Sequence, residues 1–431
     1  MSRDVLKRIF AAATCFAIMA EPLVLTSCKD DDKAPVKPAD YGTFGSDIAR
    51  EIAKEYPDRR PYSSGEWHTG EYIEGKIKEM GYQVEIQEFY NEEGGKSSNY
   101  IVKVPGSGFY CEQPDGSYQL SHRVAVIGTH YDAALLPEYV PEESEDEESE
   151  DDEDPEETTE IKYTFDGISD NASGTACVLT AMNAIRDYKN MAFDVWFVFF
   201  GAGTDECAGA QYFCKSLSHD ELSTIDVMYD IDSLYSGDKV YASSGYNSFL
   251  QNKRYEMRRK LYQTYDTCFE NTLYTNYGFD LYFNESGIKE DFNDDGYKDI
   301  FNEVSKNISD YKPFDDRLIP IVYIESYEYN FKDVEKMKET KNLSLQDFDG
   351  AIRRTPADCS FYLDSILVEE DYDRNEDGEI DCSGDRLQIR INCIAFIVVE
   401  ALLKGSDKGM TPAAYEAFKI EQTRETYTSS T

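Results

Sequence analysis

The segment Val124-Ala125-Val126-Ile127-Gly128-Thr129-His130-Tyr131-Asp132 is the most informative sequence in this chain for predicting its fold. Its first part is almost entirely apolar, which is typical of a strand that is buried on both faces of a parallel sheet. His130 and Asp132 follow directly. Because α/β sheets build their sites beyond the carboxyl ends of their strands, the segment predicts a central strand with a site at its end.

A second apolar run, Asp194–Phe200, has the same relation to the acidic pair Asp205-Glu206. Between the two runs, residues 172–187 have apolar side chains at helical spacing, which indicates a strand, helix and strand in a crossover unit. Further helices are predicted at 44–56, 68–80 and 388–403, and strands at 82–89, 98–104 and 319–324. We expect an α/β fold of three layers, with a mixed, mostly parallel, twisted sheet flanked by helices.

The charge of the chain limits its partners. The formal net charge is -42 over 431 residues, which disfavours nucleic acid and anionic membrane surfaces and favours cations and basic peptides. Thirteen carboxylates fall within residues 142–157. Such a run repels itself, so residues 136–162 are expected to be a solvated loop insertion.

The N-terminus has the pattern of an export signal, because basic residues precede an apolar stretch. Leu25-Thr26-Ser27-Cys28 resembles a bacterial lipobox, so Cys28 is predicted to carry a lipid that is the only contact with a membrane. We expect an envelope protein, an outer-membrane lipoprotein exposed at the surface, in which export permits disulfides among the remaining cysteines. The expected layout is a signal peptide at 1–27, a tether at 28–43, a main domain at 44–410 with a Tyr-rich insertion at 251–308 that covers the site, and a tail at 411–431.

Four side chains form a candidate metal site. His130 and Asp132 lie two apart in an extended segment, so both can point the same way, and an Asp at this spacing can orient a ligating imidazole. A His-x-Asp pair alone is more often a surface or core feature. Asp170, at the start of the predicted helix, and Asp232, after another apolar stretch, strengthen the interpretation. One His and two carboxylates suit zinc and leave a position for water.

The order of several short segments is similar to that in a known enzyme family. They are Gly81-Tyr82-Gln83-Val84, His130-Tyr131-Asp132, Asp170-Asn171-Ala172-Ser173-Gly174, Ile319-Pro320 and Thr355-Pro356-Ala357-Asp358. Over residues 44–404 the chain resembles the co-catalytic zinc aminopeptidases, peptidase family M28, which also includes glutaminyl cyclases and some carboxypeptidases. The resemblance implies a zinc aminopeptidase (phosphorylase/hydrolase-like) fold. It also implies that His130 and Asp232 bind one zinc ion, that Asp170 bridges to a second, and that Asp132 orients His130.

The chain departs from this family at two places. The family has two adjacent glutamates after the second strand, a general base followed by a ligand of the other zinc. Without gaps they fall on Gly203 and Thr204, whereas a shift of two residues places them on Asp205, as base, and Glu206, as ligand. The family's closing histidine is replaced by Tyr311, and a neutral phenol is a poor zinc ligand. We therefore expect one zinc ion rather than two.

The implied function is that of an exported metallopeptidase of the aminopeptidase type. It would hydrolyse a peptide or small aminoacyl substrate with a zinc-bound water, Asp205 or Glu206 as base, and a hydrogen bond from Tyr311 to the oxyanion. Cyclase activity is less expected, because the family's cyclases hold their metal at the altered site. The alternatives are an inactive lipoprotein that binds ligands with the same fold, and a calcium-stabilised surface interaction module.

Two acidic segments resemble calcium loops. Each places oxygen ligands at positions 1, 3, 5 and 9 with Gly at position 6, and each lacks the Glu at position 12. Calcium bound there would be a structural clip outside the catalytic centre; acidic surface turns have the same pattern. The predicted ligands are Asp291, Asn293, Asp295 and Asp299 in the first loop, and Asp373, Asn375, Asp377 and Asp381 in the second.

Overall fold

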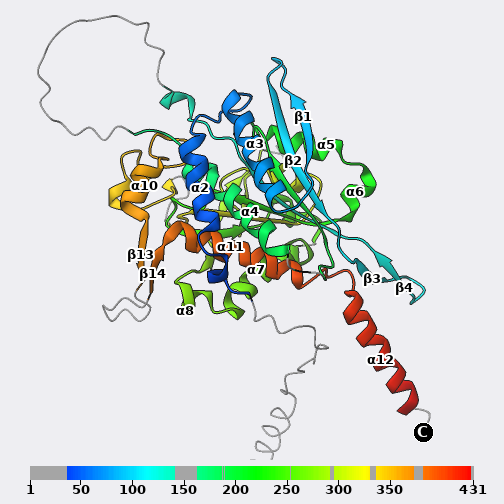
Figure 1. Ribbon diagram of the computed structural model, residues 1–431. Coiled ribbons are helices and arrows are strands. Elements are labelled where there is room, and N and C mark those ends of the chain that lie inside the picture. Colours follow the sequence, from blue (N-terminus) through cyan, green and yellow to red (C-terminus); the bar gives the residue numbers. More distant parts are fainter. Residues whose placement is uncertain are drawn as a thin grey trace, which may run out of the picture. The chain divides into compact units, whose positions relative to one another are not determined.

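An eight-stranded sheet forms the centre of the fold (Figure 1). The computed structural model describes residues 36–140, 163–186, 188, 190–252, 254–291, 296–330, 336–372 and 382–428. Residues 37–431 form one unit of the chain, separate from residues 1–36. The strand order is β1 (Glu85–Tyr90), β2 (Lys96–Val104), β6 (Asp194–Phe200), β5 (Val124–His130), β7 (Ile225–Asp232), β12 (Ile321–Tyr327), β8 (Lys239–Ser243) and β9 (Leu281–Tyr282).

The sheet is mixed, and its centre is parallel. Strand β5 pairs in parallel with β6 and β7, and β7 pairs in parallel with β12. The pairs β1 with β2, β2 with β6 and β12 with β8 are antiparallel. All seven residues of β5 are buried, which agrees with its almost continuous apolar sequence. The predicted mostly parallel sheet and central strand are confirmed.

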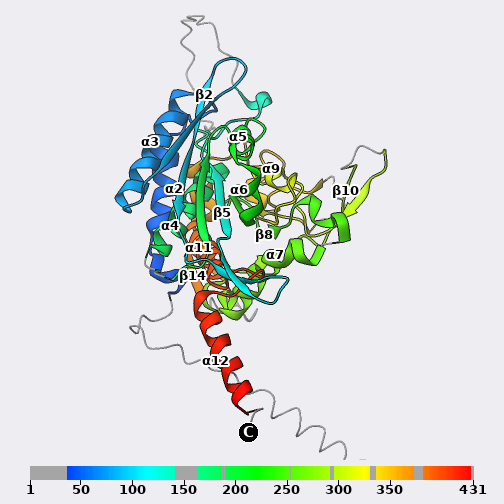
Figure 2. The ribbon, with the colours of Figure 1, turned by 90° about the vertical axis from the view of Figure 1, so that its right-hand side faces the viewer.

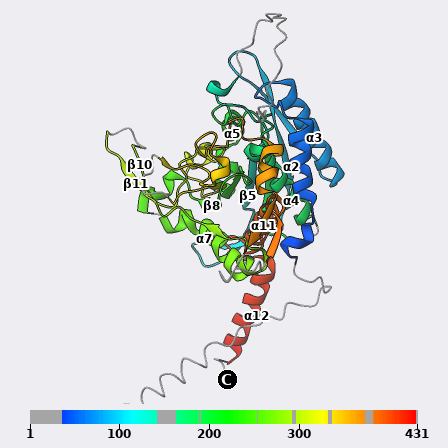
Figure 3. The same cartoon turned by 90° about the vertical axis from the view of Figure 1, so that its left-hand side faces the viewer.

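Alternate residues of the central strands pack into two separate cores, one on each face of the sheet. Helices cover both faces (Figures 2 and 3). Ala125 and Ile127 face the larger core, whereas Val124 and Val126 face the smaller one. The larger core receives side chains from α2 (Phe44–Glu55), α3 (Ser64–Glu79), α4 (Gly174–Ile185) and α11 (Arg386–Leu403). The smaller core receives them from α5 (Ala208–Ser216) and α9 (Lys312–Asp315), with α6 (His219–Thr224) beside β7. The fold therefore has the three layers that the sequence predicts.

Helix α4 makes the expected crossover between β5 and β6. A short helical turn, η3 (Ile168–Ser173), leads into it and is buried throughout. Ten of the twelve residues of α4 are buried as well, because it packs against the sheet, α2 and α11. The crossover therefore holds η3 beside the carboxyl ends of the parallel strands.

Most predicted elements are confirmed within a few residues. Strand β1 begins three residues later than its alternating pattern predicts. The reason is local: Gly81 has a left-handed φ of 87°, and the N–H of Tyr82 donates to the carbonyl of Ile77. These residues close the end of α3 rather than starting the strand.

The Tyr-rich segment is part of the structured unit. It contains α7 (Arg254–Glu270), α8 (Leu273–Tyr277) and β9, which extends the main sheet.

The expected tail contains α12 (Pro412–Thr428), and the ring of Tyr415 stacks on that of Tyr110 at 4.0 Å between centroids. The remaining α-helix of the described residues is α10 (Ser360–Leu367), and their remaining strands form three antiparallel pairs, β3 (Phe109–Glu112) with β4 (Tyr118–Ser121), β10 (Ile288–Glu290) with β11 (Asp299–Phe301), and β13 (Glu369–Tyr372) with β14 (Cys382–Asp385). Among the described helices, none is both long and apolar enough to cross a bilayer.

Candidate metal centre

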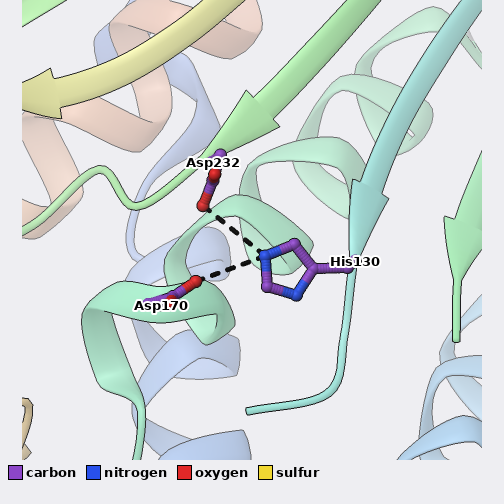
Figure 4. Close-up of side chains that lie close together, drawn as sticks. All are labelled: His130, Asp170 and Asp232. Carbon is purple, nitrogen blue, oxygen red and sulfur yellow. Dashed lines mark ion pairs between the residues drawn. The ribbon is translucent and has the colours of Figure 1, made fainter. Parts of the chain in front are cut away.

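His130, Asp170 and Asp232 converge at the carboxyl edge of the parallel strands (Figure 4). His130 ends β5, Asp232 ends β7, and Asp170 lies in η3. The Nε2 atom of His130 is 3.2 Å from Oδ1 of Asp170 and 3.6 Å from Oδ1 of Asp232. The structure thus brings together the three side chains that the sequence predicts as metal ligands.

The spacing of these three atoms suits a small divalent cation. Tetrahedral zinc with bonds of about 2.0 to 2.1 Å places neighbouring ligand atoms roughly 3.3 Å apart, which is close to the two measured distances. The three side chains are only 5%, 3% and 3% exposed. Burying two carboxylates so close together is costly unless positive charge compensates them. The donor set and its geometry therefore fit zinc.

Asp132 holds the loop beside His130. Its carboxylate accepts hydrogen bonds from the N–H groups of Gly203 (2.7 Å) and Thr204 (2.9 Å) and from the Thr204 hydroxyl (2.6 Å). The Nδ1 atom of His130 is 3.2 Å from the Asp132 carbonyl and 3.4 Å from its carboxylate. Donation from Nδ1 leaves Nε2 free to bind a metal. Burial opposes ionisation, but the bonds from His130 and Thr204 hold the pKa of Asp132 below its ordinary value.

Two buried side chains hold the segment around Asp170: Asp358, to whose segment the sequence analysis assigned no role, and Arg59, which it missed. The Asp358 carboxylate accepts hydrogen bonds from the N–H groups of Ser169 (2.8 Å) and Asp170 (3.0 Å). The fully buried guanidinium of Arg59 donates to the carbonyls of Tyr131 (3.0 Å) and Gly167 (2.6 Å). Arg59 therefore ties the segment after β5 to the segment before Asp170.

Asp232 lies in a buried polar network. The hydroxyls of Tyr323 and Ser233 each donate to it at 2.9 Å, and a guanidinium nitrogen of Arg353 lies 3.3 Å away. Arg353 also contacts Glu325 at 3.2 Å. Although burial acts in the opposite direction, the charge of Arg353 lowers the pKa of Asp232. The alternation of β12 places Tyr323 and Glu325 on one face, but no local pattern marks Arg353.

Asp205 and Glu206, the predicted base and ligand of the second zinc, are not part of the cluster of His130, Asp170 and Asp232. Gly203 packs directly on His130, because a Cβ added to Gly203 would lie 2.3 Å from that of His130. Gly203 and Thr204 therefore stand beside His130, as the reading without gaps implies. Asp205 is exposed and accepts a hydrogen bond of 2.7 Å from the Tyr62 hydroxyl. In the described part of the chain, neither Asp205 nor Glu206 joins the group of metal-binding atoms.

Tyr311 does not have the hydrogen bond that its predicted role requires. Its hydroxyl donates to the Asn307 carbonyl at 3.0 Å, so in this structure its proton is not available to an oxyanion. Burial raises the pKa of the phenol well above its ordinary value. Next to it, Asp310 is buried and neither carboxylate oxygen has a hydrogen-bond partner. Burial raises the pKa of Asp310 to about 7.

The other predicted residues lie partly outside the described ranges. Cys28, Asn293, Asp295 and the ligands of the second calcium loop, Asp373, Asn375, Asp377 and Asp381, lie outside the described residues, as does the run at 142–157. In the first loop, Asp291 accepts a hydrogen bond of 2.8 Å from the Gly296 N–H, and Asp299 begins β11.

Seven cysteines of the described ranges are free thiols: Cys111, Cys177, Cys207, Cys214, Cys268, Cys359 and Cys393.

The fold is similar to that of solved glutaminyl cyclases. The enzyme from an Acidobacteriales bacterium has a TM-score of 0.50 and 17% identity, with 88% of this chain and 100% of that chain covered. The enzyme from Fimbriiglobus ruber has a TM-score of 0.51 and 12% identity, with 88% of this chain and 99% of that chain covered. At such low identities these likenesses concern the fold.

Sequence comparison identifies the family. The alkaline phosphatase isozyme conversion protein of Escherichia coli (strain K12) is 24% identical over 205 residues, which span 47% of this chain and 54% of that relative. A sequence model described as "Peptidase family M28" matches residues 113–344. This match covers more than half of the chain and contains His130, Asp170 and Asp232. The chain therefore belongs to peptidase family M28.

Proposed function

We propose that this protein is a metal-dependent peptidase with one zinc ion, bound by His130, Asp170 and Asp232. The observation that carries the proposal is the convergence of three buried ligand atoms at distances of 3.2 and 3.6 Å. When bound, zinc would supply Lewis-acid activation of water and of the substrate carbonyl. An aminopeptidase acting on peptides or small aminoacyl compounds at the cell envelope, anchored through Cys28, is the form that the family and the N-terminal sequence favour.

The residues around the three ligands hold them in a binding arrangement. Asp132 and its carbonyl keep the Nε2 atom of His130 directed at the two carboxylates. Tyr323 and Arg353 lie on Oδ2 of Asp232, so its Oδ1 is the oxygen that faces His130. These contacts act before any substrate binds, and such preorganisation is what a metal site requires.

A second candidate is a non-catalytic protein that binds peptides. It is favoured by one observation: Gly203 packs on His130 and Thr204 bonds to Asp132 beside it, and neither residue can act as a carboxylate base. In this case the metal would be held, but hydrolysis would be absent.

Elemental analysis of the purified protein tests the metal site. We expect about one transition-metal ion per chain in the unsubstituted protein and none in His130→Ala, because the imidazole supplies one of three ligands. His122→Ala is a matched control, since His122 also lies beside an aspartate, Asp194, at 3.1 Å but is exposed. Equal metal content in all three proteins would contradict the proposed site.

Turnover separates the two candidates. The zinc-loaded protein is incubated with aminoacyl and peptide substrates, with His130→Ala as the blank. Hydrolysis that is lost in His130→Ala supports the peptidase, whereas metal binding without hydrolysis supports the binding protein.

A further inference from the structure

A pocket of about 540 Å³ lies beside the metal centre, between the loop at 203–207, α5 and α9. Gly203 and Thr204 form one wall of it. The same two residues donate their N–H groups to Asp132, and Gly203 packs on His130. The pocket is therefore separated from the metal ligands by the thickness of one loop.

Four basic side chains line this pocket: Lys215, Lys312, Arg317 and Arg354. The two acidic residues of the lining are Glu206 and Asp316, and Asp316 is paired with Lys312. Within the described ranges, no carboxylate pairs with Lys215, Arg317 or Arg354. The lining of this pocket has an excess of positive charge, in contrast to the net charge of -42 of the whole chain, and such a pocket attracts anions.

Two of these cations are held in place by backbone contacts. A guanidinium nitrogen of Arg317 donates to the carbonyl of Pro313 at 2.6 Å, and the Nε atom of Arg354 donates to that of Ala134 at 3.4 Å. A guanidinium has five N–H donors, so most remain for a ligand. The preceding residue, Arg353, contacts Asp232. Consecutive arginines thus connect the metal centre with the pocket.

We propose that this pocket binds a carboxylate of the substrate, and that Lys215, Arg317 and Arg354 determine a preference for peptides that carry this carboxylate over their neutral counterparts. The proposal rests on the proposed function, because it assigns a substrate class to the same site. Arginine suits this task since its planar group binds a carboxylate through two parallel hydrogen bonds. The carboxylate belongs either to an Asp or Glu side chain or to the free C-terminus of a short peptide.

Calorimetric titration of the zinc-loaded protein with four peptides tests the proposal. The peptides share one sequence, carry either Glu or Gln at one position, and end in either a free acid or an amide. We expect a peptide with the recognised carboxylate to bind about fivefold to tenfold more tightly than its neutral counterpart, as two or three partly exposed ion pairs allow. The position whose neutralisation weakens binding identifies the source of the carboxylate. Equal affinity for all four peptides would overturn the proposal.

The double variant Lys215→Gln/Arg317→Gln tests the residues themselves. It should bind the acidic and neutral peptides equally, while its metal content stays unchanged. The control is Lys54→Gln/Lys306→Gln, which removes two exposed lysines outside the pocket lining and should keep the preference. A preference that survives in the first variant, or is lost in both, would overturn the assignment.

Salt dependence provides a second test if the double variant does not fold. In the unsubstituted protein, added salt should weaken binding of the acidic peptide more than that of the neutral one, because partly exposed ion pairs are screened. An identical salt response would overturn the proposal. Hydrolysis with no charge preference would contradict the proposed role of the pocket but not the proposed peptidase activity. Charge-selective binding by a protein that holds no metal would contradict the peptidase proposal but not the role of the pocket.

Discussion

At the scale of single residues, we predict that Asp132 contributes to metal affinity. Its carboxylate accepts three hydrogen bonds from Gly203 and Thr204. Asp132→Asn would turn an amide donor toward one of these N–H or O–H groups and loosen the loop that positions His130. We expect zinc affinity to fall roughly 10- to 100-fold, as measured by competition with a chromogenic chelator.

Asp194→Asn is the matched control for this change. Asp194 also contacts a histidine, His122, at 3.1 Å, and it is not one of the residues at the metal centre. Zinc affinity should be unaffected. An equal loss in both variants would show that Asp132 has no specific role.

The buried Lys260 leads us to predict how the stability of the protein depends on pH. It is 4% exposed, and burial lowers its pKa to about 8 from the ordinary value of 10.5. A lowered pKa means that the folded state favours the neutral amine, so stability rises as pH increases from 8 to 10.5, falls over the same interval as pH decreases, and no longer depends on this group below pH 8. The unfolding free energy of the protein minus that of Lys260→Met should rise by roughly 2 to 3 kcal/mol over this interval.

Denaturant unfolding at several pH values measures this difference. The change in unfolding free energy that Lys260→Met causes at a single pH is less informative than its dependence on pH, because the ammonium also donates hydrogen bonds to Gly405 and Gln263. Lys306→Met is the control, since Lys306 is exposed. A flat or falling difference between pH 8 and 10.5 would contradict the prediction.

At the scale of elements, two of the three glycines in helix α3 have opposite surroundings. A Cβ at Gly75 would meet no heavy atom within 4 Å, whereas one at Gly65 would lie 1.6 Å from the backbone carbonyl oxygen of Asp58. Gly75→Ala should stabilise the protein by about 0.5 to 1 kcal/mol, because alanine loses less backbone entropy in a helix. Gly65→Ala should destabilise it by about 1 to 3 kcal/mol through the clash.

Urea unfolding of both variants checks this pair of predictions. Each is the control for the other, because the substitution and the helix are the same. If both changes have the same sign, the described packing of α3 on the segment around Asp58 is wrong.

The loop after β6 shows the limit of prediction for a single element. The strand itself is evident from its apolar run, but the sequence permits either Gly203-Thr204 or Asp205-Glu206 as the pair that faces the site. The choice depends on close packing against His130 and on hydrogen bonds to Asp132. Both partners come from another strand, so no pattern within the loop encodes it.

At the scale of the whole molecule, metal binding should be linked to unfolding. Asp132, Asp170 and Asp232 are all buried near one histidine, and a divalent cation relieves their repulsion. A ligand that binds only the folded state at a free concentration 100 times its Kd stabilises it by about 2.7 kcal/mol. Removal of zinc with a chelator should therefore lower the thermal midpoint, and zinc should restore it.

Calorimetry of the chelated and reloaded protein measures this linkage. In His130→Ala the midpoint should no longer respond to zinc. A midpoint that is equally sensitive to zinc in this variant would place the stabilising ion elsewhere in the molecule.

The sheet, the crossover and the candidate ligands His130, Asp170 and Asp232 could be predicted from the amino-acid sequence, because each depends on local periodicity or on residues at the end of a strand or the start of a helix. The surroundings of these three side chains could not be predicted in this way. Arg59, Arg353 and Asp358 reach the centre from segments far from the residues they contact, and Asp205 turns to Tyr62 instead. Such contacts depend on how distant segments pack together, and packing leaves no periodic signal along the chain.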